Sequence, residues 1–290
     1  RRISTVMRKL IFIAWLLPCL LVAGAAHSQT IRQAREQVEM SMVVRGHVDI
    51  DRGGHVTAYE LEQPEKLPGY VFNLIAGSVP TMRFEPLEVD GEAVLARAKM
   101  TLRLVANPEG EQVLLSIRSA HFGDESALPD EERVTHVRMD PPRYPIEALR
   151  VGGKGSVYLL LKVGRDGSVE DVVVEQTNLR SLGTARQMER VRSSLEKASI
   201  SAARRWRFAP PVAGEEADDP HWALRVPVDY YIDDETEPAY GQWVAYHPGE
   251  RAPRPEWAEE DAPGFSPDLL AAGRPHPAKS RFRLLNMPEG

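Results

Sequence analysis

Cysteine is almost absent from this sequence, since Cys19 is the only one among 290 residues. A single cysteine excludes an intrachain disulfide, so the chain depends on a hydrophobic core, which its length permits. The eight histidines do not cluster at a spacing typical of metal ligands. We therefore expect neither a disulfide framework nor a metal site.

Catalytic motifs are also missing. The sequence has no Gly-x-Ser-x-Gly nucleophile elbow, no phosphate-binding loop, no dinucleotide fingerprint and no zinc-hydrolase helix. We expect a protein that is not an enzyme, with no catalytic residue and no cofactor. The third-ranked hypothesis is an enzyme that uses a cleft between two units of the chain.

Long hydrophobic runs are limited to one, Leu10–Ala26, which follows two basic residues. It is short for a bilayer-spanning helix of roughly 20 residues, and Pro18 interrupts it. Small residues at Ala26 and Ser28 suit a cleavage site. We predict a cleaved signal peptide at residues 1–28, with a retained inner-membrane anchor as the alternative.

Positive charge is in short supply once that segment is removed. Cleavage would take away four cations and change the formal charge from −6 to −10. An acidic exported protein is a poor candidate for binding nucleic acid or anionic lipid.

One structural pattern is written twice in the chain. Each copy reads as a β-hairpin, a helix, a motif of apolar residue, Arg, Phe, any residue and Pro, and then an alternating strand. The motif Met82–Pro86 corresponds to Trp206–Pro210, and the glycine-containing turn Asp51–Gly54 to Gly164–Gly167. Such a repeat predicts two tandem domains of one fold. The expected strands and helices lie at residues 40–50, 55–61, 69–79 and 95–105, and at residues 146–149, 155–163, 169–174, 182–205 and 223–232.

The second copy has the clearer strands. Its first strand places four apolar residues on one face: Val157, Leu159, Leu161 and Val163. A change of parity between Val169 and Val172 predicts a β-bulge. Pro227 cannot donate to a ladder, so we expect the last strand to lie at an edge of its sheet.

Several short motifs of the second copy follow a familiar order. They are Pro142-Arg143-Tyr144-Pro145 with Ala148, Gly155-Ser156-Val157, Asp166-Gly167-Ser168-Val169, the run from Ala202 to Pro210, and Leu224-Arg225-Val226-Pro227-Val228. In this combination residues 138–232 resemble the TonB C-terminal domain family. The first copy, about residues 41–106, resembles a degenerate form that lacks the Tyr-Pro opening and has Met82 where tryptophan is usual.

The resemblance implies an α+β fold with two tandem small domains. Each would be an antiparallel sheet of about three strands with helices packed on one face. The family domain lies in the periplasm and binds a short extended segment of an outer-membrane transporter by strand addition. An exposed edge strand offers main-chain hydrogen bonds, and flanking side chains give specificity. The implied peptide-binding edge consists of Arg225, Val226, Pro227, Val228, Asp229, Tyr230 and Tyr231.

The family motif also includes residues with structural roles. They are Tyr144, Pro145, Gly167, Trp206, Phe208 and Pro210. We expect Trp206 and Phe208 to anchor the core, because large aromatic side chains dominate small cores. The pair Tyr144 and Pro145 is expected to fix the entry of a helix, with a partner-binding surface as the alternative.

The expected function is that of a periplasmic protein-binding module whose partner is a protein or peptide, with a TonB-dependent outer-membrane transporter as the partner that the family implies. The alternative is a structural or assembly protein of the cell envelope, whose domains or edge strands pair with each other without transducing energy. The cleavable N-terminal segment and the absence of a long proline-rich spacer before the domain argue against an energy-transducing role, and they favour a soluble periplasmic relative that binds proteins without transmitting force.

The predicted domain boundaries follow from these patterns. They are a signal peptide or anchor at residues 1–28, a degenerate domain at 29–106, a linker at 107–137, a second domain at 138–233 and a proline-rich tail at 234–290. Within the linker, the short apolar run at residues 113–117 indicates one short strand. The tail lacks sustained periodicity, so we expect it to be largely irregular, with one extra strand near residues 240–246.

Overall fold

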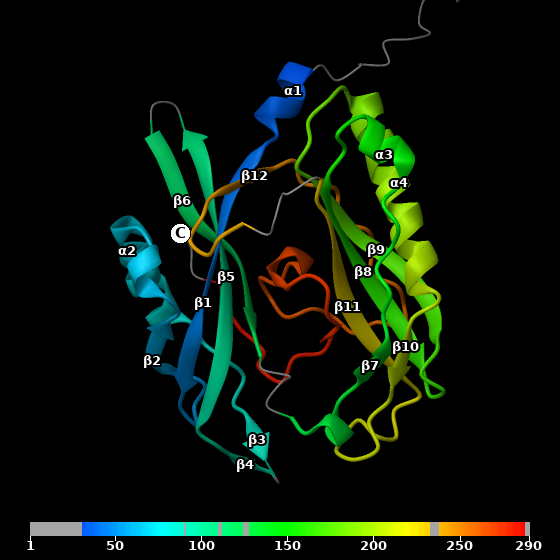
Figure 1. Ribbon diagram of the computed structural model, residues 1–290. Helices are drawn as coiled ribbons and strands as arrows, with labels where there is room; N and C mark the ends of the chain where they lie inside the picture. Colours follow the sequence, from blue (N-terminus) through cyan, green and yellow to red (C-terminus); the bar gives the residue numbers. More distant parts are fainter. Residues whose placement is uncertain (1–30, 90, 110–111, 124–127, 233–237, 288–290) are drawn as a thin grey trace, which may run out of the picture.

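The computed structural model describes residues 31–89, 91–109, 112–123, 128–232 and 238–287. The predicted signal peptide lies outside these residues. Two antiparallel sheets face each other, and each carries its main helix on the outer side (Figure 1). The fold class is therefore α+β, as expected. Within the described ranges, no helix combines the length and apolar character needed to cross a membrane.

The first sheet is built around β1 (Glu39–Ile50). β1 pairs with β2 (Val56–Leu61) on one side and with β5 (Ala96–Glu109) on the other. β6 (Gln112–Phe122) adds to the outer edge of β5. The sheet therefore extends into the predicted linker, where only a short apolar run had indicated a strand, and it exceeds the expected three strands.

Helix α2 (Gly69–Ser78) covers the outer face of the first sheet. It begins after Pro68, and Val71 and Ile75 lie one turn apart on its buried face. These side chains pack against strand residues such as Met100 and Leu102 in one hydrophobic core. A proline-containing 3-10 turn, η2 (Val79–Thr81), then ends the helix.

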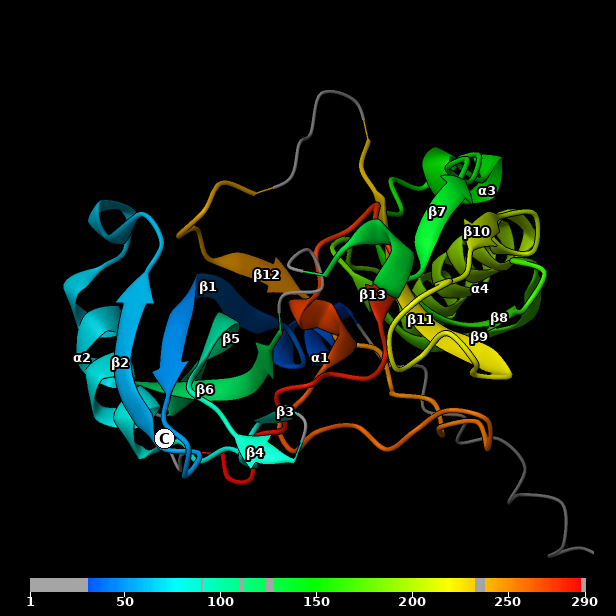
Figure 2. The ribbon, with the colours of Figure 1, turned by 90° about the horizontal axis from the view of Figure 1, so that it is seen from below.

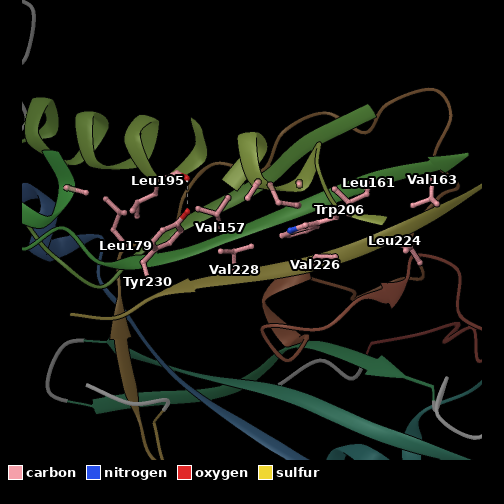
Figure 3. Close-up of a cluster of buried hydrophobic side chains, with 14 of the residues drawn as sticks. Val157, Leu161, Val163, Leu179, Leu195, Trp206, Leu224, Val226, Val228 and Tyr230 are labelled. Atoms are coloured by element: carbon pink, nitrogen blue, oxygen red, sulfur yellow. Dashed lines mark hydrogen bonds between the residues drawn. The ribbon is translucent and has the colours of Figure 1, made fainter. Parts of the chain in front are cut away.

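The second sheet is built around β8 (Gly155–Gly164), which pairs with β9 (Val169–Leu179) and with β11 (His221–Tyr230). Its register with β9 shifts between Lys162 and Val163, which confirms the predicted bulge. Helix α4 (Ala185–Ala203) begins with a capping box between Thr184 and Gln187. Figure 3 shows α4 above the sheet, with the apolar side chains of β8 and β11 between them.

The same contact at the hairpin turn occurs once in each sheet's own unit. Gly54 and Gly167 both have positive φ, 80° and 74°. Gly54 O accepts a hydrogen bond from Phe84 N at 2.8 Å, and Gly167 O accepts one from Phe208 N at 2.9 Å. The apolar-Arg-Phe-x-Pro motif therefore docks on the hairpin turn of its own unit in both cases. An origin of the two units as tandem copies remains a prediction.

Shorter elements complete the two units. They are α1 (Ile31–Glu36), η1 (Pro64–Lys66), β3 (Glu88–Val89), β4 (Glu92–Ala93), η4 (Asp130–Glu132), β7 (Thr135–Arg138), α3 (Ile146–Arg150) and β10 (Arg207–Ala209). We call residues 39–122 the first unit and residues 135–230 the second unit.

Residues 238–287, hereafter the C-terminal segment, run between the two sheets (Figures 1 and 2). β12 (Val244–Tyr246) pairs with β1 of the first sheet. The turn η5 (Pro267–Leu269) is buried between the sheets, and β13 (His276–Pro277) pairs with β11 of the second sheet. The segment has little regular structure, yet it joins both units.

Candidate protein-binding edge

Strand β11 carries six of the seven residues of the predicted peptide-binding edge, and Tyr231 directly follows it. Its even-numbered side chains enter the core beneath α4, as Figure 3 shows for Leu224, Val226, Val228 and Tyr230. The odd-numbered side chains lie on the opposite face of the sheet, toward the C-terminal segment. The sequence alternation predicted this division between the two faces.

Backbone groups also alternate along β11. Ala223 O accepts a hydrogen bond from Ala278 N at 2.9 Å, and Pro227 O accepts one from Gly273 N at 3.0 Å. Arg225 lies opposite His276. Odd-numbered residues therefore direct their N–H and C=O groups away from β8, and even-numbered residues direct theirs toward β8. Pro227 occupies an outward position, where only its carbonyl is used, so the ladder with β8 loses no hydrogen bond.

The outer edge of β11 is not free, which corrects the expectation of an open edge. β13 covers it at Leu224 and Arg225, and the two flanking hydrogen bonds extend the cover from Ala223 to Pro227. The sequence did not indicate that the edge is covered, because the covering residues follow the strand by about 50 positions in an irregular tail. The alternating prolines Pro275 and Pro277 were the available signal.

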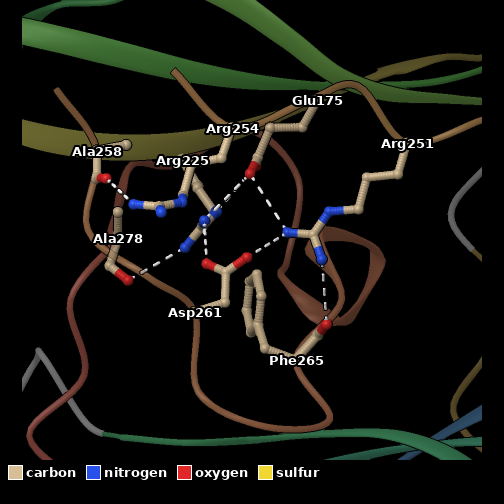
Figure 4. A network of polar contacts seen from close by, with 8 residues as sticks. All are labelled: Glu175, Arg225, Arg251, Arg254, Ala258, Asp261, Phe265 and Ala278. Atoms are coloured by element: carbon tan, nitrogen blue, oxygen red, sulfur yellow. Dashed lines mark hydrogen bonds and ion pairs between the residues drawn. The ribbon is translucent and has the colours of Figure 1, made fainter. Parts of the chain in front are cut away.

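Arg225 is the centre of a buried ionic network (Figure 4). Its guanidinium group binds both carboxylate oxygens of Glu175, at 2.8 and 3.1 Å, and Asp261 at 2.5 Å. The side chains of Arg225 and Glu175 are only 4% and 8% exposed. Arg251 also binds Asp261, and the ring of Phe265 lies 4.4 Å from the Arg225 guanidinium carbon. This side chain therefore holds the C-terminal segment on the sheet.

Other residues of the predicted edge also have partners within the chain. Tyr230 is buried, and its hydroxyl lies 2.8 Å from Ser199 Oγ. Burial raises the pKa of Tyr230 to about 12. Tyr231 is half-buried, donates to Asp229 at 2.9 Å and stacks with Arg180 at 4.3 Å. The Asp229 and Tyr231 side chains sit beside the part of the edge that β13 leaves uncovered.

The family-motif residues have structural roles in and around the core of the second unit. Trp206 and Phe208 are buried in the core, and Trp206 Nε1 donates to Asp140 O at 2.8 Å. Tyr144 donates to Gly153 O at 2.6 Å and its ring packs edge-on against Tyr230. Pro145 precedes the first turn of α3.

Gly167 and Pro210 complete this framework at the hairpin turn. A Cβ at Gly167 would lie 1.9 Å from Phe208 O and 3.5 Å from the ring of Pro210. The turn therefore admits only glycine there.

A cavity of about 510 Å³ lies between the two sheets beside the C-terminal segment. Its lining includes cationic, tyrosine and amide side chains, among them Lys99, Arg180, Tyr158 and Asn178. Burial raises the pKa of the Tyr158 phenol far above its ordinary value, so this hydroxyl stays neutral. Among the described residues, no group of His, Cys, Asp and Glu side chains is arranged to hold a metal ion.

Comparison with known proteins assigns the second unit. Residues 140–232 match the family model of the Gram-negative bacterial TonB protein C-terminal. The protein TonB of Xanthomonas campestris pv. campestris (strain B100) is 32% identical over 100 residues, which are 34% of this chain and 38% of that protein. Protein tonB2 of Pseudomonas aeruginosa is 31% identical over 91 residues, which are 31% of this chain and 28% of that protein.

A solved structure gives a further similarity. The solution NMR structure of the Pseudomonas aeruginosa TonB CTD has 25% sequence identity, covers 38% of this chain and 94% of its own, and has a TM-score of 0.22. The match to the two curated relatives covers only 38% and 28% of their own length, so the chain spans well under half of each. At residues 140–232 the chain carries a domain of the TonB C-terminal family.

Proposed function

We propose that this protein is a periplasmic, non-catalytic binding module, and that its second unit binds an extended segment of a partner protein by strand addition at the outer edge of β11. The observation that carries the proposal is that this edge already pairs with an extended strand, β13. The family match of the same residues links the module to TonB-dependent outer-membrane transport. The partner would be an exposed segment of such a transporter.

The edge suits recognition through the main chain. Ala223, Arg225, Pro227 and Asp229 direct their backbone groups outward, and the proline removes one donor from the series. A partner strand would gain hydrogen bonds to these groups whatever its sequence. Specificity would come from side chains at the end of the edge, where Asp229 and Tyr231 lie.

The periplasmic location rests on the predicted signal peptide at residues 1–28 and on the envelope role of the family. The whole-protein role is proposed for the domain at residues 140–232 and does not extend to the first unit. There the edge of β5 that corresponds to β11 is covered by β6.

The test uses the full chain and synthetic peptides that cover the periplasmic N-terminal segments of the outer-membrane transporters encoded in the same genome. We expect a bound peptide to shift the backbone amide NMR signals of Ala223, Arg225 and Asp229 more than those of α4. Ala223→Pro removes an outward N–H that makes no backbone hydrogen bond within the described part of the chain. It should weaken binding about fivefold, the effect of one hydrogen bond worth ~1 kcal/mol.

Ala223→Val is the matched control, because it keeps the N–H and should bind like the wild type. Peptide-induced shifts confined to the first unit, or equal affinities of the two variants, would reject β11 as the site.

A second candidate is a structural or assembly role in the envelope. One observation favours it: a single C-terminal segment pairs with both sheets, through β12 and β13. An assembly protein should show a mass that rises with concentration in sedimentation and no response to the transporter peptides. A constant monomer mass together with peptide binding would reject this candidate.

A further inference from the structure

The two sheets have the same strand arrangement, and this allows a comparison of their edges. The order β2-β1-β5-β6 in the first sheet corresponds to β9-β8-β11-β13 in the second. β6 pairs with β5 from Met100 to Glu109, with one register shift along the way. β13 pairs with β11 at Leu224 and Arg225 only. The corresponding edge is thus closed firmly in the first unit and weakly in the second.

The residues that close β11 form a short strand with few anchors. Gly273 and Ala278 donate backbone hydrogen bonds to Pro227 and Ala223, and Arg225 Nη1 donates to Ala278 O at 3.1 Å. His276 is buried opposite Arg225, and its Nε2 lies 2.8 Å from Ala271 O. We call residues 273–278 the edge cap.

Prolines alternate in the edge cap with residues that face β11. His276 and Ala278 direct their backbone groups toward β11, so the neighbouring Pro275 and Pro277 direct their nitrogens to the other side. A proline nitrogen carries no hydrogen, so the outer side of the cap lacks donors at these two positions. The cap therefore pairs with β11 but offers few hydrogen-bond donors to a further strand. Prolines at natural sheet edges prevent aggregation in the same way.

We propose that the edge cap is an intramolecular occupant of the binding edge, which a partner strand must displace. This inference rests on the proposed function, because it assigns the regulation of the same site. It also names the chemistry of the partner segment. That segment is extended, has N–H groups on alternate residues opposite Ala223, Arg225 and Pro227, and tolerates proline at the positions between.

The test uses the full chain, and the probe is a fluorescent synthetic peptide with the sequence of residues 271–280, AAGRPHPAKS. His276→Pro removes the N–H that faces Arg225 and should release the cap. The peptide should then bind this variant at least tenfold more tightly than the wild type. Lys279→Pro is the matched control, since the Lys279 backbone nitrogen makes no backbone hydrogen bond in the described part of the chain; this variant should behave like the wild type.

A measurement on the wild type keeps the inference testable if His276→Pro fails to fold. The amide of Arg225 faces the cap, whereas that of Val226 faces β8. Hydrogen exchange at the Arg225 amide should be at least a hundredfold faster than at the Val226 amide, because the cap opens while the pairing of β11 with β8 stays closed. Equal exchange rates at the two amides, or equal peptide affinity of all three proteins, would overturn the edge cap.

The outcome also separates this inference from the proposed function. If the released variant binds the 271–280 peptide but no transporter peptide, the cap stands and the transporter as partner is rejected. If transporter peptides bind the wild type and the released variant with equal affinity, a displaced cap is rejected and the binding function stands.

Discussion

At the scale of the residue, Gly167 shows how strictly one position can be determined. Its φ is positive, and the Phe208 carbonyl that closes the turn leaves no room for a side chain. Gly54 makes the same contact with Phe84 in the first unit. The sequence predicted a glycine-dependent turn in both hairpins. It did not indicate that the Phe of the apolar-Arg-Phe-x-Pro motif is the residue that docks on it.

Gly167→Ala should therefore destabilise the protein strongly. The methyl group meets a backbone carbonyl that cannot move without breaking the turn, in addition to the strain of positive φ, roughly 1 kcal/mol for a non-glycine residue. Gly152→Ala isolates the strain, because Gly152 also has positive φ, 65°, but nothing lies within 4 Å of its added Cβ. Urea denaturation should show that Gly167→Ala loses ~2 kcal/mol more than Gly152→Ala; equal losses would contradict the steric account.

The side-chain partners of Arg225 could not be predicted from the sequence. The sequence placed it correctly on the odd-numbered face of β11. Its partners Glu175 and Asp261 come from β9 and from the C-terminal segment, at separations of 50 and 36 residues. No local pattern indicates such a network, because its geometry exists only after the sheet and the segment have come together.

At the scale of the element, the helices and central strands followed their periodicity. The predicted apolar face of β8 is fully buried, and α2 ends within one residue of its predicted boundary. β6 was underestimated, since residues 118–122 include polar side chains and the strand continues through Arg118, Ser119 and His121. Pairing with β5 holds these residues in a strand, and that pairing is a tertiary effect.

The junction between β9 and the C-terminal segment should respond to pH. His247 and Leu179 exchange backbone hydrogen bonds, and the His247 ring lies 2.8 Å from Arg192 Nη2 through Nδ1 and 2.9 Å from Gln37 Oε1 through Nε2. Arg192 can only donate, so the ring accepts at Nδ1 and is neutral. Burial, and then the charge of Arg192, lower the pKa of His247 below its ordinary value of about 6.5.

A lowered pKa in the folded state means that the unfolded chain binds the proton more readily. The contribution of His247 to stability is therefore complete above about pH 6.5 and is lost as the pH falls below that value. His247→Gln keeps one acceptor and one donor but does not titrate. Thermal unfolding at pH 7.5 and 5.5 should show a smaller acid-induced loss in this variant; an equal loss would assign the pH response to other groups.

At the scale of the whole molecule, the C-terminal segment decides how the two units sit. Asp268 is the link, because its carboxylate lies 3.0 Å from Arg103 of β5 and 3.5 Å from Asn178 of β9. The sequence predicted two α+β units and an irregular tail. It could not predict that the tail fills the space between the sheets, since residues that interact across about 200 positions leave no periodic signal.

Asp268→Ala should be among the most damaging substitutions in the chain. It leaves Arg103, whose side chain is 8% exposed, without its carboxylate. An uncompensated buried charge costs about 3–5 kcal/mol. Urea denaturation should also show broader or separate transitions as the two units lose their link.

Glu60→Ala is the control for that substitution. It removes an ion pair with Arg97 in which both side chains are more than half exposed, so it should cost less than about 1 kcal/mol. Similar losses for the two variants would show that Asp268 does not join the units.

The long-range course of the C-terminal segment also sets an order of events during biosynthesis. Tyr240 is hydrogen-bonded to Arg45, 195 residues earlier, and Asn286 to Arg83, 203 residues earlier. The ribosome completes both units before it makes these residues. Contacts at such separations are slow to form, because a long loop must close before any of them contributes. Docking of the segment is therefore expected to be the last and slowest phase of folding, during which the nascent second unit passes through a period with an uncapped β-strand.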